Sequence, residues 1–278
     1  MLNVDLHCHS NVSDGALAPA AVAARAKAGG VDVWALTDHD EIGGIAEARD
    51  AAHALGMQYV TGVEISVTWA GRTVHIVGLQ FDEHNRDLVE GLKRTRSGRE
   101  HRAREMADQL ALVGIPNAFE GALKYVGNPD LISRTHFARY LVETGACKDI
   151  AEVFSNYLVD GKPGYVPHRW ATLKDAVGWI RGAGGIAVVA HPGRYDFNDL
   201  ELDAFLAEFK QLGGAGVEVV TGSHTVDEYA RFAAIARERG LLASRGSDFH
   251  APGESQTELG SLPPLPPNLT PVWHDWRV

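Results

Sequence analysis

Near the start of the chain, the segment Val4-Asp5-Leu6-His7-Cys8-His9 is a short apolar run that ends in two histidines. Side chains two residues apart on a strand point to the same face, so both imidazoles should lie together. Cys8 should point the other way, into the core. The segment therefore predicts a buried strand whose end presents two metal-binding nitrogens.

The same arrangement recurs along the chain, because one apolar run after another ends in a histidine or a carboxylate. Asp14 or His75 taken alone would suit a turn or a core position, but the ordered set indicates a shared role. Six imidazoles and three carboxylates are too many for one catalytic base. They favour a cluster of divalent metal ions, and hence a hydrolase that acts on a charged substrate. The candidate ligands are His7, His9, Asp14, His39, Glu64, His75, His191, Asp248 and His250.

Strands rich in valine, isoleucine and leucine alternate with alanine-rich helices over most of the chain. Continuously apolar strands in such an alternation predict an α/β fold with a parallel sheet covered on both faces. So many repeating units favour a barrel, whose chemistry lies at the carboxyl ends of its strands. The predicted strands are 3–6, 31–36, 58–62, 73–79, 185–190, 216–220 and 241–243, and the predicted helices are 19–28, 44–55, 173–183, 200–212 and 225–239.

Residues 82–170 interrupt this alternation with charged sequence of helical pattern, over 88–113, 134–144 and 150–158. We therefore predict a barrel formed by residues 1–81 and 171–278, with residues 82–170 inserted as a helical lid over the site. Five of the twelve prolines lie between residues 261 and 271, which predicts an extended tail on the surface.

Composition excludes several classes of protein. A net charge of −10 argues against an indiscriminate nucleic-acid coat protein, but metals and a local basic patch would still admit a small anionic substrate. Two cysteines do not make a disulfide framework. We find no signal-peptide pattern and no apolar run of membrane-spanning length, so we expect a cytoplasmic protein with no membrane partner. The oligomeric state is left open.

A basic cluster from Lys93 to Arg104 holds six cations against the single acid Glu100 and reverses the sign of the charge locally. Two interpretations stay open, a solvated helix face or a funnel for phosphates. Guanidinium groups suit bidentate phosphate contacts, and Tyr195 would either contact a nucleoside or pack under the lid. The candidate substrate-binding residues are Arg99, Arg102, Arg134, His136, Lys162, Arg194 and Tyr195.

The ordered motifs DLHCHS, SDG, LTDHD, GVEIS, VHIVGL, AHPGR and GSDFH resemble the PHP (polymerase and histidinol phosphatase) family. Within the insertion, ISRTHFAR and GKPGYV resemble the branch of 3′,5′-nucleoside bisphosphate phosphatases and RNase AM-type 5′→3′ exoribonucleases. The resemblance implies a distorted (β/α)₇ barrel that hydrolyses phosphate esters. It also implies three divalent metal ions, usually manganese, although iron or zinc would suit the same ligands.

The resemblance further implies how the ligands are shared. The first metal would be held by His7, His9, Glu64 and Asp248, the second by Asp14, His39 and His250, and the third by Glu64, His75 and His191. Asp40, or a water on the metals, would protonate the leaving oxygen. Asp40, His191 and Asp248 are thus the expected catalytic residues.

Two substrates suit this site, and both carry a 5′-phosphate. The first is a nucleoside 3′,5′-bisphosphate such as pAp, which would yield a 5′-monophosphate and phosphate. The alternative is a short 5′-phosphorylated RNA cleaved from its 5′ end. A histidinol-phosphate phosphatase is disfavoured by the ISRTHFAR and GKPGYV segments. A non-catalytic PHP binding module is disfavoured because it predicts lost ligands.

Overall fold

A single sheet of seven strands curls into a nearly closed barrel in the computed structural model, which describes residues 2–276. Its order follows the sequence: β1 (Val4–Asp5), β2 (Val33–Leu36), β3 (Gln58–Trp69), β4 (Arg72–Leu79), β5 (Ile186–Val189), β6 (Gly216–Thr221) and β7 (Leu242–Gly246). The two edges meet where the Leu6 amide donates to the Arg245 carbonyl at 3.0 Å. The predicted α/β barrel is therefore confirmed.

The sheet is not wholly parallel, and the prediction was wrong on this point. β4 runs antiparallel to both β3 and β5. The reason is the two-residue connection Ala70-Gly71, in which both residues have positive φ, 46° and 77°. Such a turn reverses the chain into a hairpin without a crossover helix. His75 consequently lies early in its strand, beside Ser66, near the carboxyl ends of the parallel strands.

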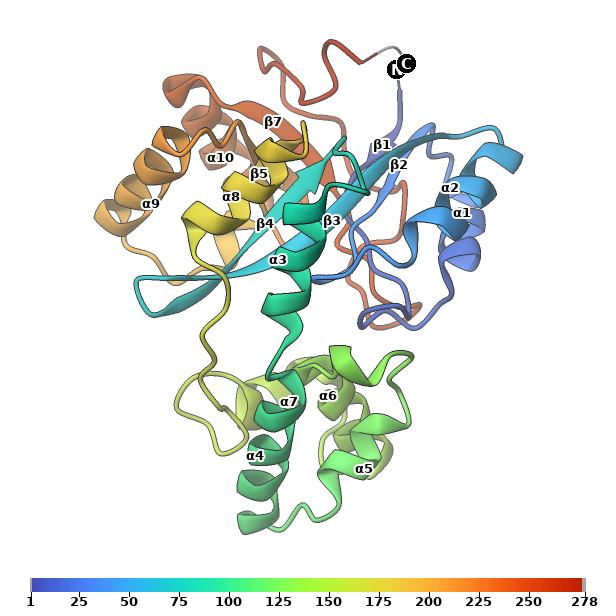
Figure 1. Cartoon of the computed structure of the whole chain (residues 1–278), viewed down its shortest axis with the longest axis vertical. Coiled ribbons are helices and arrows are strands. Elements are labelled where there is room, and N and C mark those ends of the chain that lie inside the picture. Colours follow the sequence, from blue (N-terminus) through green and yellow to red (C-terminus); the bar gives the residue numbers. More distant parts are fainter. Residues whose placement is uncertain (1, 277–278) are drawn as a thin grey trace.

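Helices cover the outside of the barrel (Figure 1). They are α1 (Pro19–Ala28), α2 (Ile45–Ala54), α3 (Arg86–Arg96), α8 (Leu173–Gly182), α9 (Asp199–Gln211) and α10 (Val226–Arg239). α9 and α10 begin at reciprocal capping boxes, Asn198 with Glu201 and Thr225 with Glu228. Among residues 2–276, no helix combines the length and the apolar character that crossing a membrane requires.

Apart from η3 (Pro192–Arg194), a single turn that follows β5, the remaining helices form a compact body below the barrel in Figure 1. They are α4 (Arg99–Leu112), α5 (Ala118–Leu123), η1 (Pro129–Leu131), α6 (Arg134–Glu143), α7 (Ile150–Val153) and η2 (Phe154–Leu158). This body has an apolar core of its own, which includes Met106, Leu110 and Phe137. The insertion is thus a small helical unit beside the carboxyl ends of the barrel strands.

The expected helix over 88–113 is broken, because Ser97 is extended and Gly98 adopts a left-handed φ of 91°. α3 packs on the barrel helix α8, where a side chain at Gly91 would meet the Trp179 ring. Leu88 and Leu92 accordingly belong to the barrel core. The separate core of the insertion begins only at α4, about one helix later than the predicted boundary at residue 82.

Candidate functional site

Nine side chains from across the barrel converge at the carboxyl ends of its strands. Their ligand atoms form four overlapping groups, each within 4.8 Å. Glu64 on β3 lies at the centre, since its Oε2 is 3.0–3.2 Å from nitrogens of His7, His9 and His39. Its Oε1 is 2.9 Å from nitrogens of His75 and His191. The nine residues are those expected from the sequence: His7, His9, Asp14, His39, Glu64, His75, His191, Asp248 and His250.

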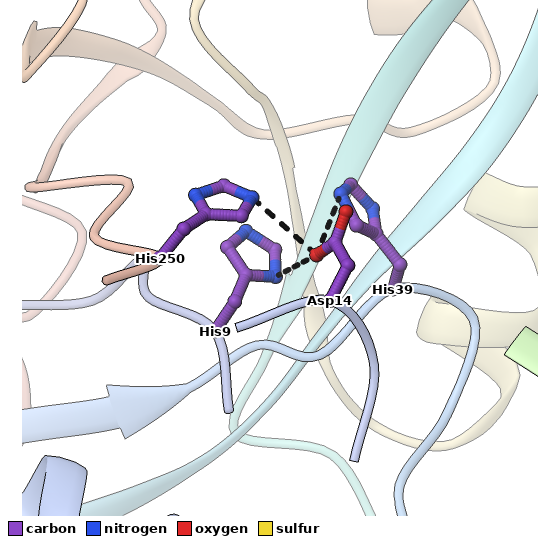
Figure 2. A group of neighbouring side chains, drawn as sticks. All are labelled: His9, Asp14, His39 and His250. Atoms are coloured by element: carbon purple, nitrogen blue, oxygen red, sulfur yellow. Dashed lines mark ion pairs between the residues drawn. The ribbon is translucent and has the colours of Figure 1, made fainter. Parts of the chain in front are cut away.

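A second carboxylate, Asp14, organises one side of this cluster. Figure 2 shows the imidazoles of His9, His39 and His250 directed at its Oδ1, at 4.0, 3.8 and 3.4 Å. His250 is oriented by its Nδ1, which donates to the Asp248 carbonyl at 2.9 Å and leaves Nε2 free to face Asp14. Three nitrogens and one oxygen around a common point are a suitable ligand set for a divalent cation.

Several buried ligand atoms lack a hydrogen-bond partner within residues 2–276, which tests whether these side chains fit metal ions. They are His9 Nδ1, Asp14 Oδ1, His39 Nδ1, Glu64 Oε2 and His191 Nδ1. An unsatisfied buried carboxylate oxygen is costly unless a cation compensates it. Imidazole and carboxylate donors suit zinc, manganese and iron alike. The residues therefore fit divalent metal binding.

The electrostatics of the cluster also favour cations. Burial alone would raise the pKa of Glu64, but His39, His75 and His7 hold that pKa well below its usual value. Burial lowers the pKa of His191 to about 4, so this imidazole stays neutral and can act as a ligand. Burial would lower the pKa of His9 too, yet Asp248 and Glu64 raise it to about 10. The negative charge around His9 thus attracts a cation.

The buried carboxylate of Glu218, on β6, holds two of the ligands in place. It accepts from His7 Nδ1 at 2.8 Å and from the His191 amide at 2.7 Å. Such a partner fixes the ring orientation and the tautomer of a metal-binding histidine. The sequence placed Glu218 near a strand end but could not pair it with His7, because the two residues are 211 positions apart.

Asp38 precedes the ligand His39 in sequence, but its side chain supports a turn and not the imidazole. It accepts from the Ser10 amide at 2.8 Å, from the Ser10 hydroxyl at 2.7 Å and from the Ser13 hydroxyl at 2.6 Å. These contacts fix the turn that leads into Asp14. The side chain therefore acts on the metal site through a loop rather than through an imidazole.

Three site residues have positive φ although they are not glycine: Asp40 at 51°, His191 at 27° and Asp248 at 55°. This conformation costs free energy for a residue with a side chain and is often found where a functional side chain must be aimed. All three follow directly on the barrel strands or their extensions. Three of the seven non-glycine residues with positive φ among residues 2–276 thus lie at the site.

Arginines line the same cleft as the metal ligands. Arg99, Arg102, Arg134 and Arg194 all face it, together with the aromatic rings of Phe154 and Trp170. The guanidinium carbons of Arg99 and Arg102 lie 4.5 and 5.4 Å from the centre of the Trp170 ring, and that of Arg134 lies 5.6 Å from Phe154. The aromatic planes hold the cations in place without neutralising them.

Arg99 and Arg194 each pair with a carboxylate, Asp40 and Asp248, but Arg102 and Arg134 have no carboxylate partner among residues 2–276. Burial, with repulsion from Arg134 and Arg99, lowers the pKa of Arg102 to about 9. Within residues 2–276, Arg102 and Arg134 bond only to the carbonyls of Val166 and Leu158, at 2.8 and 3.2 Å. A phosphate would relieve the repulsion and accept charge-assisted hydrogen bonds. These arginines therefore form a candidate anion site beside the metal ligands.

Only part of the basic cluster contributes to this anion site. Arg94 stacks on Trp179, Arg96 pairs with Glu41, and Arg104 pairs with Glu100. Arg99 and Arg102, three residues apart on α4, are the members that face the cleft. Of the two interpretations left open, the phosphate funnel thus suits these two arginines and the solvated face suits Arg104.

Three predicted substrate-binding residues do not line the cleft. Lys162 is exposed on its loop, and His136 is buried, with its Nδ1 accepting from the Ser133 amide at the start of α6. The Tyr195 hydroxyl is buried below the cleft, where it accepts from the His75 amide at 2.8 Å and donates to the Ala190 carbonyl at 2.9 Å. Tyr195 thus supports the strands that carry two ligands, His75 and His191.

Asp40, predicted to be catalytic, also does not line the cleft. Its completely buried carboxylate accepts from the amide and the hydroxyl of Ser66, at 2.7 and 2.8 Å, and pairs with Arg99. Both oxygens are therefore engaged. The residue expected to donate a proton instead links strand β3 to an arginine of the anion site.

The cleft wall contains residues that the sequence did not single out. Ser133 and Thr135, at the start of α6, donate to Asp14 Oδ2 at 3.2 and 3.0 Å. They leave the other oxygen of Asp14 for the metal side and fasten the insertion to the barrel. Phe154 and Trp170 were missed because nothing in the local sequence separates a cleft aromatic from a core aromatic.

Comparison with known proteins gives concordant results. The sequence matches the PHP domain family over residues 5–186. A 3′,5′-nucleoside bisphosphate phosphatase from Chromobacterium violaceum is 52% identical over 99% of this chain and 96% of the relative. A 5′-3′ exoribonuclease from Haemophilus influenzae is 43% identical over 97% of each chain.

Solved structures agree with the fold. An amidohydrolase from Chromobacterium violaceum, solved with bound sulfate and no metal, superposes with a TM-score of 0.95 at 52% identity, over 98% of this chain and 94% of that one. A protein from Bifidobacterium adolescentis assigned as a metal-dependent phosphoesterase gives 0.81 at 29% identity, over 97% and 92%. The match thus includes the helical insertion as well as the barrel.

Proposed function

The chain belongs to the PHP domain family, and from this premise we propose that it removes the 3′-phosphate of nucleoside 3′,5′-bisphosphates such as pAp. The products are a nucleoside 5′-monophosphate and phosphate. The family and the 52% identity to a bisphosphate phosphatase identify the chain as a phosphate ester hydrolase. The bisphosphate specificity rests on one observation, which is that the metal ligands and a separate group of arginines share a single cleft.

This pairing suits a substrate with two phosphates. The metal-ligand cluster is the place for the phosphate that reacts, and Arg99, Arg102 and Arg134 would hold the phosphate that does not. A monophosphate would leave the guanidinium groups repelling one another inside the cleft. The 5′-phosphate of a bisphosphate removes that repulsion, so its binding energy helps to align the 3′-phosphate for attack.

The metal complement is three divalent ions, most naturally manganese, with iron or zinc compatible with the same donors. As the family resemblance implies, His7, His9, Glu64 and Asp248 would hold the first, Asp14, His39 and His250 the second, and Glu64, His75 and His191 the third. The groups of neighbouring ligand atoms overlap differently, since they also place His9 with Asp14 and His7 with Glu64 and His191. When bound, such ions lower the pKa of water and neutralise charge on the phosphoryl oxygens.

Arginines in the cleft would then orient the substrate. Arg194 donates to Asp248 at 3.0 Å and faces the cleft, so it can also contact an oxygen of the reacting phosphate. Asp40 positions Arg99 through their ion pair and does not reach the reacting atoms. The proton for the leaving 3′-oxygen is accordingly supplied by solvent in the cleft.

The proposal is tested by incubating purified protein, loaded with Mn²⁺, with pAp and separating the products. We expect phosphate and AMP in equal amounts. Protein with verified bound metal that releases no phosphate from pAp would refute the proposed function.

A second candidate is a 5′→3′ exoribonuclease acting on short 5′-phosphorylated RNA. It is favoured by the 43% identity to an exoribonuclease and by the shared requirement for a 5′-phosphate site. The two reactions break the same bond to the 3′-oxygen, so one enzyme can perform both. We propose the cytoplasm as the compartment, because both cysteines, Cys8 and Cys147, are free thiols.

A further inference from the structure

We propose that a second pocket beside the cleft binds the nucleoside that follows the scissile phosphate when the substrate is RNA. This second pocket lies between Gly222-Ser223, after β6, and the segment Glu254–Gln256. The inference rests on the proposed function, because it extends the same site to a longer substrate. The residues of the second pocket would then determine how well RNA is used as a substrate relative to a nucleoside bisphosphate.

The second pocket is continuous with the cleft. Five residues line both, namely Thr135, Phe154, Arg194, Asp248 and His250. Two of these are metal-ligand candidates, so the reacting phosphate would lie at the junction of the two spaces. Arg99 and Arg102 line the cleft but not the second pocket, whereas Ser223 and Gln256 line the second pocket but not the cleft. The anion site and the second pocket are therefore reached from different sides of the junction.

The direction of the substrate follows from its chemistry. The 5′-phosphate lies on the arginines and the scissile phosphorus at the metal ligands, so the first nucleoside spans the cleft between them. In the reaction, a water oxygen bonds to phosphorus, the bond to the 3′-oxygen breaks, and that oxygen takes up a proton. The phosphate stays on the 5′-oxygen of the next nucleoside, which must lie beyond the junction. In pAp that position is empty of substrate.

The lining of the second pocket suits a ribose and a base. Ser223 offers a hydroxyl, Gln256 offers an amide, and Phe154 and Ile150 offer apolar surface. The Ser223 hydroxyl is buried and has no hydrogen-bond partner among the described residues, so it is available to a ligand. Glu254 is neutralised by its bidentate pair with Arg139. Hydroxyl and amide groups beside an aromatic ring match the polar edges and the π face of a nucleoside.

The charges farther along limit the site to one added nucleotide. A third, mainly apolar pocket adjoins the second through Ile150, Glu254 and Gln256. Its lining holds three acids, Glu143, Asp149 and Glu254, against two cations, Arg139 and Lys148. This region would repel the next phosphate of a longer chain. Binding should therefore improve from one nucleotide to two and then stop improving.

The test compares three substrates on the holoenzyme: pAp, the dinucleotide pApA and the trinucleotide pApApA. Gln256→Trp fills the second pocket from its exposed rim, and Gln256→Glu adds one negative charge without changing size. Gln109→Glu adds the same charge at an exposed position on α4 that lines neither space. The readout is the ratio of kcat/KM for pApA to that for pAp.

We expect both Gln256 variants to lower this ratio about tenfold, the size of one lost stacking or polar nucleoside contact. Gln109→Glu should leave the ratio as in the wild type, and pApApA should be cleaved no better than pApA. The inference is overturned if the wild type does not cleave pApA, or if the ratio is unchanged in both Gln256 variants. Failure of the proposed function gives a different result, in which pAp itself is not hydrolysed.

Discussion

The carboxyl end of the barrel and the helical insertion line one cleft, but the position of their functional side chains is fixed in different ways. Apart from Asp14, which lies in a turn, the metal ligands sit on strands or a few residues after them, where period-two alternation and strand ends dictate direction. The arginines of the insertion sit on helices whose position depends on tertiary contacts, among them the pair between Asp40 and Arg99. The first region is specified locally and the second by long-range packing. This difference predicts unequal consequences when each is changed.

The largest effect should follow from Glu64→Gln, at the centre of the metal ligands. The amide keeps the shape but loses the charge that balances the surrounding cations. Changes to the outer partners of ligands already cost 10- to 100-fold, so we expect a loss of more than about 100-fold in activity with pAp. Metal content, measured on the same preparation, should fall as well.

The control for that variant is Glu238→Gln, at an exposed position on α10, which should retain both metal and activity. If Glu64→Gln keeps its full metal content and its rate, the barrel end does not hold the catalytic metals.

A smaller effect is expected from Arg134→Ala in the insertion. Loss of one charge-assisted phosphate contact costs about 2–3 kcal/mol, which corresponds to roughly 30- to 150-fold in kcat/KM. Metal content should not change, because Arg134 contacts no metal ligand. Arg104→Ala, at an exposed position of the same insertion, serves as the matched control. If Arg134→Ala also loses metal, the insertion arginines and the metal ligands do not act independently, which contradicts this prediction.

The smallest of these effects should come from Asp40→Asn, which joins the two regions. Asparagine tolerates the positive φ at this position and keeps an acceptor for Ser66, but it loses the ion pair with Arg99. We expect a rise in KM for pAp of about tenfold, with kcat largely retained. A residue that donated a proton in the reaction would instead lower kcat, and that result would restore the catalytic role expected from the sequence.

Strand-end residues were predictable because their direction needs only the alternation of the strand. His7 and His9 share a face wherever the strand packs, and each further ligand follows its own apolar run. The turn Ala70-Gly71 was missed, and with it the reversed direction of β4. Ala-Gly is a much weaker sequence signal for a two-residue hairpin turn than Asn-Gly.

The supporting residues depended on distances that no local pattern contains. Glu218 reaches His7 across the barrel, and Thr135 reaches Asp14 across 121 positions. Tyr195 follows His191 closely in sequence, yet its hydroxyl turns beneath the cleft to bond the backbone. Charge alone also could not separate Arg102, which faces the cleft, from Arg104, which faces Glu100.

A single cleft that binds two phosphates, one at the metal ligands and one at the arginines, would explain a preference for nucleoside bisphosphates. The most direct test of this explanation is the ratio of kcat/KM for pAp to that for adenosine 3′-monophosphate, in the wild type and in Arg102→Ala. We expect the wild type to prefer pAp by about 100-fold or more in kcat/KM, and we expect Arg102→Ala to reduce this preference at least tenfold. Equal use of both substrates by the wild type, or a preference that survives Arg102→Ala unchanged, would contradict it.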